Sequence, residues 1–310
     1  MQTEQPVKLI RGRRVRGDLP RARKPDWLKV RAPGSPGYLR LKHLLRDLDL
    51  RTVCEEANCP NIGECWSHGT ATFMILGDTC TRSCGYCNVT HGAPSAIDPQ
   101  EPGRVGAAVA RLSLDHVVVT SVDRDDLPDG GAAAFAATIQ AIKSAAPTCA
   151  VEVLIPDFTG RVRDVETVLD VEPDILNHNI ETVARLYRAA RPGGRYDRAL
   201  DLLDHAQHYR PRTPTKSGLM VGLGEEPSEV EVTLADLRKV GCDIVTIGQY
   251  LRPSAAHLPV AHYYTPDEFS ELACVARGLG FGHVEAGPLV RSSYHAHEQS
   301  ASFKRTRLSL

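Results

Sequence analysis

The chain has 310 residues, which is enough for one large domain with extensions or for two small domains. Its 37 basic and 38 acidic side chains leave a formal net charge of −1, so nucleic acid is not an expected partner. The sequence contains no run of roughly 20 apolar residues and no apolar signal core, so we expect a cytoplasmic protein without a membrane partner. Nine cysteines in such a chain indicate metal binding or catalysis rather than disulfides.

Residues 1–37 form an arm rich in Arg, Lys, Pro and Gly, with little apolar periodicity. Charge runs usually stay solvated, so one interpretation is a loose tail. The other interpretation is a segment that docks on an acidic protein partner, because opposite charges steer association. The amphipathic stretch at 38–50 that follows predicts a helix.

From residue 70 onward, short β-rich runs alternate with longer helical patterns, which is typical of a parallel sheet buried on both faces. We expect strands at 72–77, 116–122, 150–156, 174–180, 216–224 and 243–251. We expect helices at 103–114, 131–146, 183–190, 199–209 and 228–241. These units predict an α/β fold, a partial (β/α)6 barrel with N- and C-terminal extensions, and leave an open doubly wound sheet as the alternative. In both folds the chemistry belongs at the carboxyl ends of the strands.

The first predicted strand runs into a loop that reads CTRSCGYC. Its cysteines, Cys80, Cys84 and Cys87, are called the downstream triplet below. Three such thiolates suit three irons of a cubane cluster and leave one iron open to an exogenous ligand. A structural zinc site is the competing interpretation, although closed zinc sites normally use four ligands in paired knuckles.

A second group, CEEANCPNIGEC, lies just before the first strand and contains Cys54, Cys59 and Cys65, the upstream triplet. Its Gly, Pro and Asn residues predict irregular structure. Three local thiolates again suggest a cluster, whose fourth ligand must come from a distant residue or from the substrate. The other cysteines lie in or beside core-forming segments, where a lone cysteine is usually a small hydrophobe; they are Cys149, Cys242 and Cys274.

The downstream spacing, at the end of the first strand and with Tyr86 before the last cysteine, resembles the radical S-adenosylmethionine superfamily. Both spacings together are similar to the lipoyl synthase family, and the resemblance runs from about residue 50 to residue 298. Further matching stretches lie at 117–131, 177–196, 215–225, 247–260 and 287–296.

The resemblance implies two 4Fe–4S clusters and S-adenosylmethionine as cofactors. The downstream triplet would hold the catalytic cluster that cleaves S-adenosylmethionine to a radical. The upstream triplet would hold a cluster that gives up sulfur, with Ser292 of the RSSY motif as its labile fourth ligand and a catalytic residue. The implied reaction inserts two sulfur atoms at carbons 6 and 8 of a protein-bound octanoyl-lysine, whose unactivated C–H bonds require cofactor chemistry.

The same resemblance implies a division of the chain and a set of partners. Residues 1–69 would be the basic arm and auxiliary-cluster extension, 70–281 the partial barrel, and 282–310 a C-terminal extension closing over the auxiliary cluster. The implied partners are octanoylated lipoyl-carrier domains (2-oxoacid dehydrogenase E2 subunits and the glycine cleavage H protein), an electron donor such as ferredoxin or flavodoxin, and an iron–sulfur carrier that rebuilds the cluster.

Two other functions remain as alternatives. Another radical sulfur-inserting synthase, resembling biotin synthase, would use the downstream triplet but would lack the upstream one. A non-catalytic iron–sulfur electron-transfer protein would explain the cysteines but not several polar strand ends on a barrel.

Polar residues near two strand ends are candidates to hold S-adenosylmethionine, because carboxylates and amides match its hydroxyl and amino groups and an arginine suits its carboxylate. These cofactor-binding candidates are Thr120, Ser121, Asp123, Asn179, Glu181 and Arg195, together with Tyr86. Helix capping is an equal explanation for Asn179 and Glu181. Residues 124–126 are alternatively an exposed loop, and Gly222 and Gly224 are expected to let the backbone approach a ligand or turn sharply.

Overall fold

The computed structural model describes residues 24–30, 33–67, 71–294 and 296. In these residues an eight-stranded sheet follows the order β1-β2-β5-β6-β7-β8-β9-β10. The strands are β1 (Arg51–Thr52), β2 (Thr72–Ile75), β5 (His116–Ser121), β6 (Ala150–Leu154), β7 (Ile175–Asn177), β8 (Thr215–Val221), β9 (Ile244–Gln249) and β10 (His283–Gly287). Strand β1 is antiparallel to β2, and all other pairs are parallel.

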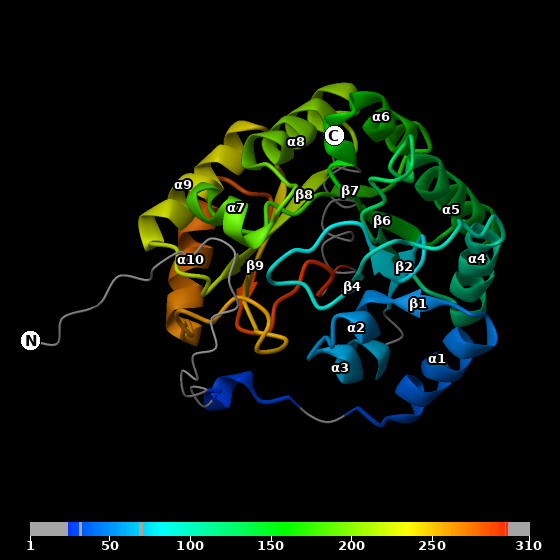
Figure 1. Cartoon of the computed structure of the whole chain (residues 1–310), viewed down its shortest axis with the longest axis horizontal. Helices are drawn as coiled ribbons and strands as arrows, with labels where there is room; N and C mark the ends of the chain where they lie inside the picture. Colours follow the sequence, from blue (N-terminus) through cyan, green and yellow to red (C-terminus); the bar gives the residue numbers. More distant parts are fainter. Residues whose placement is uncertain (1–23, 31–32, 68–70, 295, 297–310) are drawn as a thin grey trace, which may run out of the picture.

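The longer helices form an arc on the outer side of the curved sheet (Figure 1). They are α4 (Glu101–Leu112), α5 (Ala132–Ala145), α6 (Val162–Asp170), α8 (Tyr196–Tyr209), α9 (Pro227–Lys239) and α10 (Pro266–Gly278). Shorter helices in the connections are η2 (Phe158–Gly160), η3 (Ala184–Leu186) and α7 (Tyr187–Ala190). This arrangement confirms the predicted α/β partial barrel and adds β1 and β10 to the six predicted strands.

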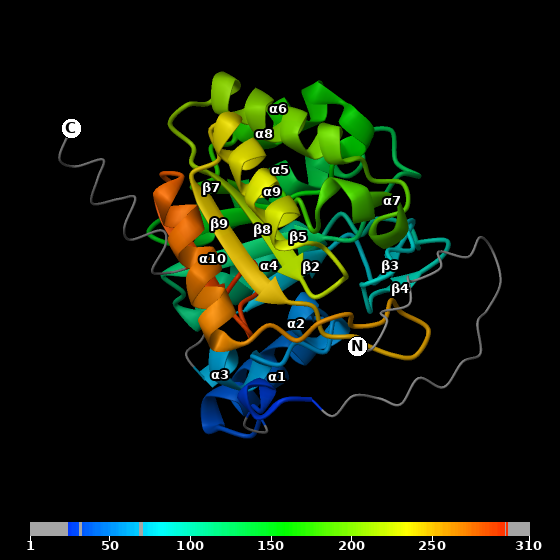
Figure 2. The ribbon, with the colours of Figure 1, turned by 90° about the vertical axis from the view of Figure 1, so that its left-hand side faces the viewer.

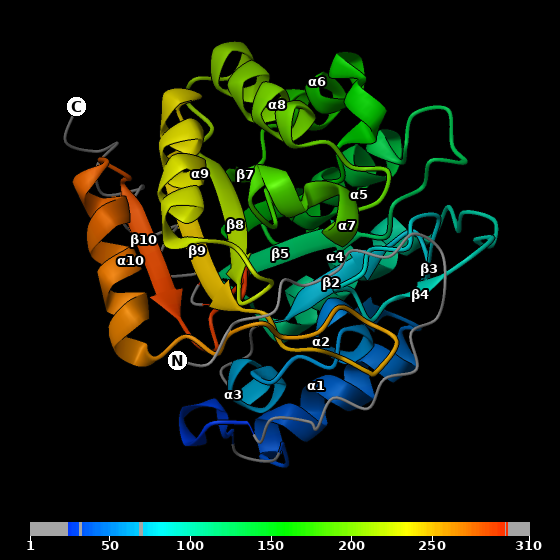
Figure 3. The ribbon, with the colours of Figure 1, turned by 60° about the vertical axis from the view of Figure 1, so that its left-hand side comes forward.

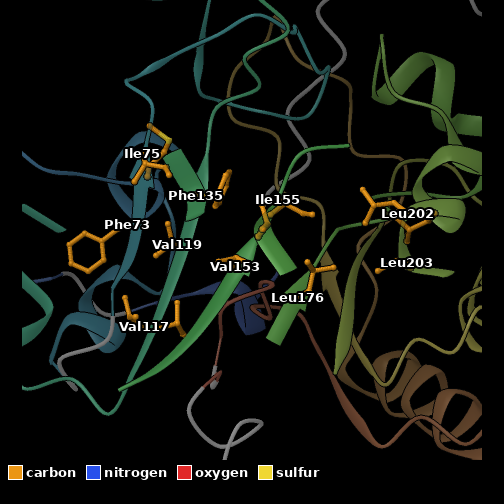
Figure 4. Packing of buried hydrophobic residues seen from close by; sticks show 14 of the residues in the cluster. Phe73, Ile75, Val117, Val119, Phe135, Val153, Ile155, Leu176, Leu202 and Leu203 are labelled. Carbon is orange, nitrogen blue, oxygen red and sulfur yellow. The ribbon is translucent and has the colours of Figure 1, made fainter. Parts of the chain in front are cut away.

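The strand sequences do not alternate between apolar and polar residues, because both faces of each inner strand are buried. In β5, Val117, Val118 and Val119 are all buried, although successive side chains point to opposite faces of a strand. Figure 4 shows Val117 and Val119 among the apolar side chains of neighbouring strands, with Phe135 of α5 close by. Both faces of the parallel sheet are therefore covered.

Three helices precede the barrel and lie together below the strands in Figure 3. The predicted helix at 38–50 is confirmed as α1 (Pro36–Asp47), which begins after the capping residue Ser35. The prediction of irregular structure around the upstream triplet is wrong, because the chain forms α2 (Val53–Glu56) and α3 (Ile62–Ser67) there. The Thr52 side chain accepts a hydrogen bond from the Glu55 N–H and so starts α2, while the helix-breaking residues occupy the turn between the two helices. A short 3-10 helix, η1 (Asp26–Leu28), comes first.

The segment after β10 returns to the helices that carry the upstream triplet. Asn61 donates a hydrogen bond to the Leu289 carbonyl at 2.7 Å, and the Tyr294 hydroxyl lies 3.2 Å from a Glu64 carboxylate oxygen. Strand β10 belongs to the sheet although it lies in the segment 282–310 that the sequence assigned to an extension. Most of the basic arm and residues 297–310 lie outside the described residues. Among the residues described, no helix is long and apolar enough to cross a membrane.

Candidate functional site

The downstream triplet follows a sharp turn at the carboxyl end of β2. Leu76 has a positive φ of 69°, which non-glycine residues rarely adopt, and Gly77 follows with a φ of 92°. The Glu101 carboxylate accepts the Leu76 N–H at 2.8 Å, and Arg124 donates to the Leu76 carbonyl at 3.2 Å. The chain then enters β3 (Thr79–Cys80), which pairs with β4 (Thr90–His91) on the far side of the cysteine loop. The turn and this pairing hold the loop over the end of the sheet.

Two other segments hold the loop from outside. The Gly85 N–H donates to the Ala190 carbonyl at 2.8 Å, and the Gly85 carbonyl accepts the Leu258 N–H at 2.9 Å. The His257 Nε2 atom lies 2.9 Å from the Cys87 carbonyl. Figure 2 shows the long connection after β9 reaching toward β3 and β4. A Cβ atom at Gly85 would lie 3.0 Å from the Leu258 side chain, so this close approach favours glycine.

Arg82 ties the loop to the ends of β5 and β6 from inside. Its side chain is only 4% exposed and makes a bidentate pair with Asp125, at 2.7 and 2.8 Å, and a contact of 2.6 Å with Asp157. Asp123 lies 3.3 Å from the same guanidinium. Burial alone would raise the pKa of Asp157, but the hydrogen bonds and charge of Arg82 hold that pKa well below its usual range. Arg124 is buried and pairs with Asp126, so residues 124–126 form a loop that is held in place by an ion pair.

The downstream thiols are desolvated. Burial raises the pKa of Cys80 to about 11 and that of Cys84 to about 12, and burial also raises the pKa of Cys87. Thiols of this kind become metal-binding thiolates only when a cation compensates them. The Cys80 sulfur already receives two backbone N–H groups, from Arg82 at 3.4 Å and Asp123 at 3.3 Å. Such donors are typical of thiolates that ligate an iron–sulfur cluster.

Several predicted cofactor contacts meet at this triplet. Burial raises the pKa of Glu181, while the nearby Arg191 and a hydrogen bond from Asn179 at 3.2 Å oppose the rise. Tyr86 is desolvated beside Glu181 and Cys84, which raises its pKa. The capping interpretation for these side chains finds no support, because the residue that precedes η3 is Val183 and it makes no side-chain cap.

The remaining cofactor-binding candidates differ in their surroundings. The Thr120 hydroxyl donates to the Leu154 carbonyl of β6 at 3.0 Å, and the buried Ser121 hydroxyl has no partner within the described residues. Arg195 pairs with Asp197 and its side chain is 63% exposed, so it lies outside the group. Arg191, which sequence reasoning missed, is the arginine that acts on Glu181 and Cys84.

Arg191 is buried and donates to the Asn179 carbonyl at 3.0 Å and to the Tyr187 hydroxyl at 3.2 Å. The sequence RPGGRY offered two arginines, and only the fold distinguishes the buried one from the exposed one.

The prediction that Gly222 permits a sharp turn is confirmed by its φ of 101° and by a Cβ position that would lie 2.2 Å from the Gln249 amide.

The upstream triplet lines a small pocket closed by the segment after β10. The pocket is lined by Cys54, Cys59, Asn61, Cys65, Thr72, Arg291, Ser293 and Tyr294. Burial raises the pKa of Cys54 to about 11 and that of Cys65 to about 12, and it also raises the pKa of Cys59. The Arg291 guanidinium is desolvated, which lowers its pKa, and its charge acts on Cys59.

A buried N–H donor next to the pocket suits a site that holds thiolates. The indole N–H of Trp66 is buried without a hydrogen-bond partner among the described residues, and the ring stacks on Tyr38 with centroids 5.0 Å apart. Thr72 and the Trp66 indole favour the thiolate of Cys54 and oppose the effect of burial, which raises the pKa of this thiol. No three His, Cys, Asp or Glu side chains of the described residues converge around a single ion. A 4Fe–4S cluster is held by cysteine thiolates, and this pocket supplies three of them.

The two serines of the RSSY motif differ in their surroundings. The Ser292 hydroxyl accepts a hydrogen bond from the Asn179 amide at 3.0 Å, whereas Ser293 lines the pocket of the upstream triplet. Because Asn179 also bonds Glu181, Ser292 lies between the groups of the two triplets. Sequence spacing alone has no signal that separates these two hydroxyls.

Family models match two parts of the chain. The model of the radical SAM superfamily matches residues 74–237. The model described as the N-terminal domain of lipoyl synthase of the radical SAM family matches residues 2–59.

Curated relatives cover nearly the whole chain. A lipoyl synthase of Rubrobacter xylanophilus is 56% identical over 300 residues, which are 97% of this chain and 92% of the relative. A lipoyl synthase of a Roseiflexus species is 57% identical over 277 residues, covering 89% of this chain and 92% of the relative.

Solved structures share the fold at much lower identity. The FeFe-hydrogenase maturase HydG from Carboxydothermus hydrogenoformans has a TM-score of 0.56 at 13% identity and covers 86% of this chain and 69% of its own. Methylornithine synthase has a TM-score of 0.51 at 12% identity, with 82% and 79% covered. The chain therefore belongs to the lipoyl synthase family of radical S-adenosylmethionine enzymes, with the sulfur-inserting activity, the 4Fe–4S clusters and the S-adenosylmethionine that define it.

Proposed function

We propose that the downstream triplet holds the cluster that cleaves S-adenosylmethionine and that the upstream triplet holds the cluster that supplies sulfur. The observation that carries this assignment is the difference in surroundings: buried charged groups meet at the downstream triplet, and a closing tail meets the upstream one. When bound, these groups supply the radical and the sulfide that acid–base side chains cannot provide. The protein orients them, excludes water and holds the octanoyl chain between them.

Anaerobic purification with iron and sulfide analysis tests the assignment. About eight irons per chain are expected for two 4Fe–4S clusters. Reaction with S-adenosylmethionine and an octanoyl-lysine peptide is expected to release 5′-deoxyadenosine and to give a product with two added sulfurs. Recovery of zinc in place of iron, or intact S-adenosylmethionine after reduction, would overturn the assignment.

The carboxylate of S-adenosylmethionine is assigned to Arg191, and the amino and ribose groups to Asp123, Asn179 and Glu181. The support for Arg191 is its burial beside Glu181, in contrast to Arg195, which the sequence indicates but which is exposed. Arg191→Gln is expected to weaken S-adenosylmethionine binding about 10- to 100-fold, because a hydrogen bond to a charged group contributes about 1.5–3 kcal/mol. Arg195→Gln is the matched control, and a larger loss in that variant would restore Arg195 to the site.

Ser292 is assigned as the labile fourth ligand of the upstream cluster, as the family resemblance implies. Its hydrogen bond from Asn179 supports a defined position near both triplets. Ser292→Ala is expected to keep S-adenosylmethionine cleavage and to lose sulfur insertion, while Ser293→Ala retains both. The reverse result would transfer the ligand role to Ser293, which lines the pocket.

The family acts on lipoyl-carrier proteins, and we assign the octanoylated domains of 2-oxoacid dehydrogenase E2 subunits and of the glycine cleavage H protein as substrates. A ferredoxin or flavodoxin would supply electrons, and an iron–sulfur carrier would rebuild the spent cluster, all in the cytoplasm. The three-part division into 1–69, 70–281 and 282–310 also belongs to this proposal. Deletion of residues 1–30 tests the basic arm: activity on a whole carrier should fall while activity on a peptide persists.

A further inference from the structure

Two polar connections join the segment of the upstream triplet to the loop of the downstream triplet. The first starts at Asn88, the residue after Cys87, whose Nδ2 atom donates to the Glu56 carbonyl at 2.9 Å. Glu56 is the last residue of α2, the helix that carries Cys54. One hydrogen bond therefore links the end of the downstream loop to the helix of an upstream ligand.

The second connection runs through Arg51 of β1. Its guanidinium lies 3.1 Å from the Asp78 carboxylate and 3.7 Å from the Glu56 carboxylate. Asp78 precedes β3 and thus the first cysteine of the downstream loop. Glu56 is therefore tied to both ends of that loop, through Arg51 at the entry and Asn88 at the exit. We call Arg51, Glu56, Asp78 and Asn88 the inter-triplet bridge.

The bridge is poorly placed to serve folding alone. The side chains of Arg51, Asp78 and Glu56 are 47%, 41% and 28% exposed. Exposed ion pairs contribute little to stability because solvent screens them. In contrast, small displacements matter greatly between reacting groups, since a misplacement of about 1 Å can lower a rate about 100-fold.

We propose that the inter-triplet bridge sets the separation of the two cysteine triplets, and that Arg51 and Asn88 are positioning residues that couple hydrogen abstraction to sulfur transfer. The inference rests on the proposed function of the two triplets. An octanoyl carbon must meet the deoxyadenosyl radical beside the downstream triplet and a sulfide beside the upstream triplet. If the separation changes, hydrogen abstraction can proceed while the carbon no longer reaches sulfur.

The test compares Arg51→Gln and Asn88→Ala with Arg46→Gln. Arg46 of α1 makes a bidentate pair with Glu55 of α2, at 2.7 and 3.3 Å, and so contacts the same helix without reaching the downstream loop. Each variant reacts in a single turnover with excess reductant, S-adenosylmethionine and an octanoyl-lysine peptide. The measured quantity is the ratio of 5′-deoxyadenosine formed to sulfur inserted.

Arg51→Gln and Asn88→Ala are expected to raise this ratio about threefold or more, the effect of a displacement well below 1 Å. Arg46→Gln is expected to leave the ratio unchanged, and all three variants should keep the wild-type iron content. The magnetic interaction between the two reduced clusters, which depends on their separation, should change in the same two variants.

An unchanged ratio and magnetic interaction in Arg51→Gln would overturn the proposal, and so would an equal rise in Arg46→Gln. Arg51→Gln decides the result if Asn88→Ala loses a cluster, because Arg51 is not adjacent to a cysteine. Failure of the proposed function is recognised separately, because the wild-type protein itself would then lack the second cluster or the sulfur product.

Discussion

The two cysteine triplets are both desolvated but differ in what surrounds them. Burial raises one thiol pKa to about 11 and another to about 12 in each triplet. Around the downstream triplet, the buried Arg82 and Arg191 lie with the partly buried Asp123 and Glu181. Around the upstream triplet, the neighbours are core side chains such as Trp66 and a tail that brings in Arg291.

Under the proposed function, this difference corresponds to two kinds of occupant. A site for a charged, exchangeable cofactor requires fixed ionic groups that are already paired in the absence of the cofactor, as Arg82 is with three carboxylates. A site for a group that is held until it is consumed requires a closed pocket and one removable ligand. The first arrangement comes from strand ends, and the second comes from local helices and the segment that follows β10.

Removal of one cysteine from each triplet separates the two roles most strongly. Cys84→Ala is expected to abolish 5′-deoxyadenosine formation, because the cluster that binds S-adenosylmethionine loses a ligand. Cys59→Ala is expected to retain that step and about four irons per chain, while sulfur insertion stops. Iron analysis and product quantification measure both outcomes. Loss of S-adenosylmethionine cleavage in a Cys59→Ala protein that retains those irons would contradict the division of roles.

The next largest effect is expected from Arg82→Gln. This change leaves Asp123 and Asp157 buried beside each other without their cation, and removal of one partner from a buried ion pair costs about 3–5 kcal/mol. The free energy of unfolding should therefore fall strongly, as measured in urea. Arg185→Gln, which breaks an exposed bidentate pair with Glu229, is the control and should cost less than about 1 kcal/mol.

The difference in stability between wild type and Arg82→Gln should depend on pH. Asp157 has a lowered pKa in the folded chain, so its contribution to stability is present above the unfolded value of about 4. That contribution is lost as pH falls toward the folded pKa. The stability difference between wild type and Arg82→Gln should consequently shrink below about pH 4. A constant difference across this range would show that Arg82 does not act through Asp157.

Much of the barrel could be predicted from the sequence because its signals are local. Apolar β-branched runs such as 116–122 gave β5 (His116–Ser121) almost residue for residue. The predicted strands at 72–77 and 150–156 were too long, since Leu76 and Gly77 turn away and Pro156 lacks an N–H for the ladder. Strand β10 carries a weaker pattern and is paired only along β9, so its assignment required the fold.

The functional site could also be predicted from the sequence only where its signals are local. Cysteine spacing identified both triplets because each ligand set is local, whereas the groups around them come from distant segments. Nothing in the sequence indicates that Arg82 meets Asp157 or that Asn88 meets Glu56, because those contacts depend on the placement of strand ends. The sequence likewise pointed to Arg195 and did not indicate Arg191, because only the fold shows which of the two is buried beside Glu181.

A smaller effect is expected where the tail packs on β9. A Cβ atom at Gly248 would lie 2.1 Å from the Val290 carbonyl, so Gly248→Ala forces the tail away from the upstream pocket. Overpacking of this kind typically costs about 1–3 kcal/mol. We expect lower stability and loss of iron from the upstream cluster with retained S-adenosylmethionine cleavage. Gly278→Ala is the control, because no atom lies within 4 Å of its Cβ position. Equal iron content in both variants would show that tail packing is not required at the upstream site.

The smallest expected effect concerns a single buried N–H donor beside the upstream triplet. Trp66→Phe keeps a ring on Tyr38 but removes a buried N–H that has no partner among the described residues and that favours the Cys54 thiolate, so this N–H is available to a sulfur of the upstream cluster. An N–H donor stabilises the more negative, reduced cluster, so its removal should lower the reduction potential of the upstream cluster. A hydrogen bond of about 0.5–1.5 kcal/mol corresponds to a shift of about 20–60 mV for one electron.

Redox titration followed by electron paramagnetic resonance measures the shift, with Trp27→Phe as the matched control. The Trp27 N–H donates to the Tyr264 carbonyl at 3.2 Å, and the side chain is 40% exposed. Trp27→Phe should therefore leave both cluster potentials unchanged. A shift of the downstream potential in Trp66→Phe would show that the donor does not act locally, because this indole belongs to the upstream helices. A lowered upstream potential alone would establish that the two triplets are tuned separately, by a core donor in one case and by backbone N–H groups in the other.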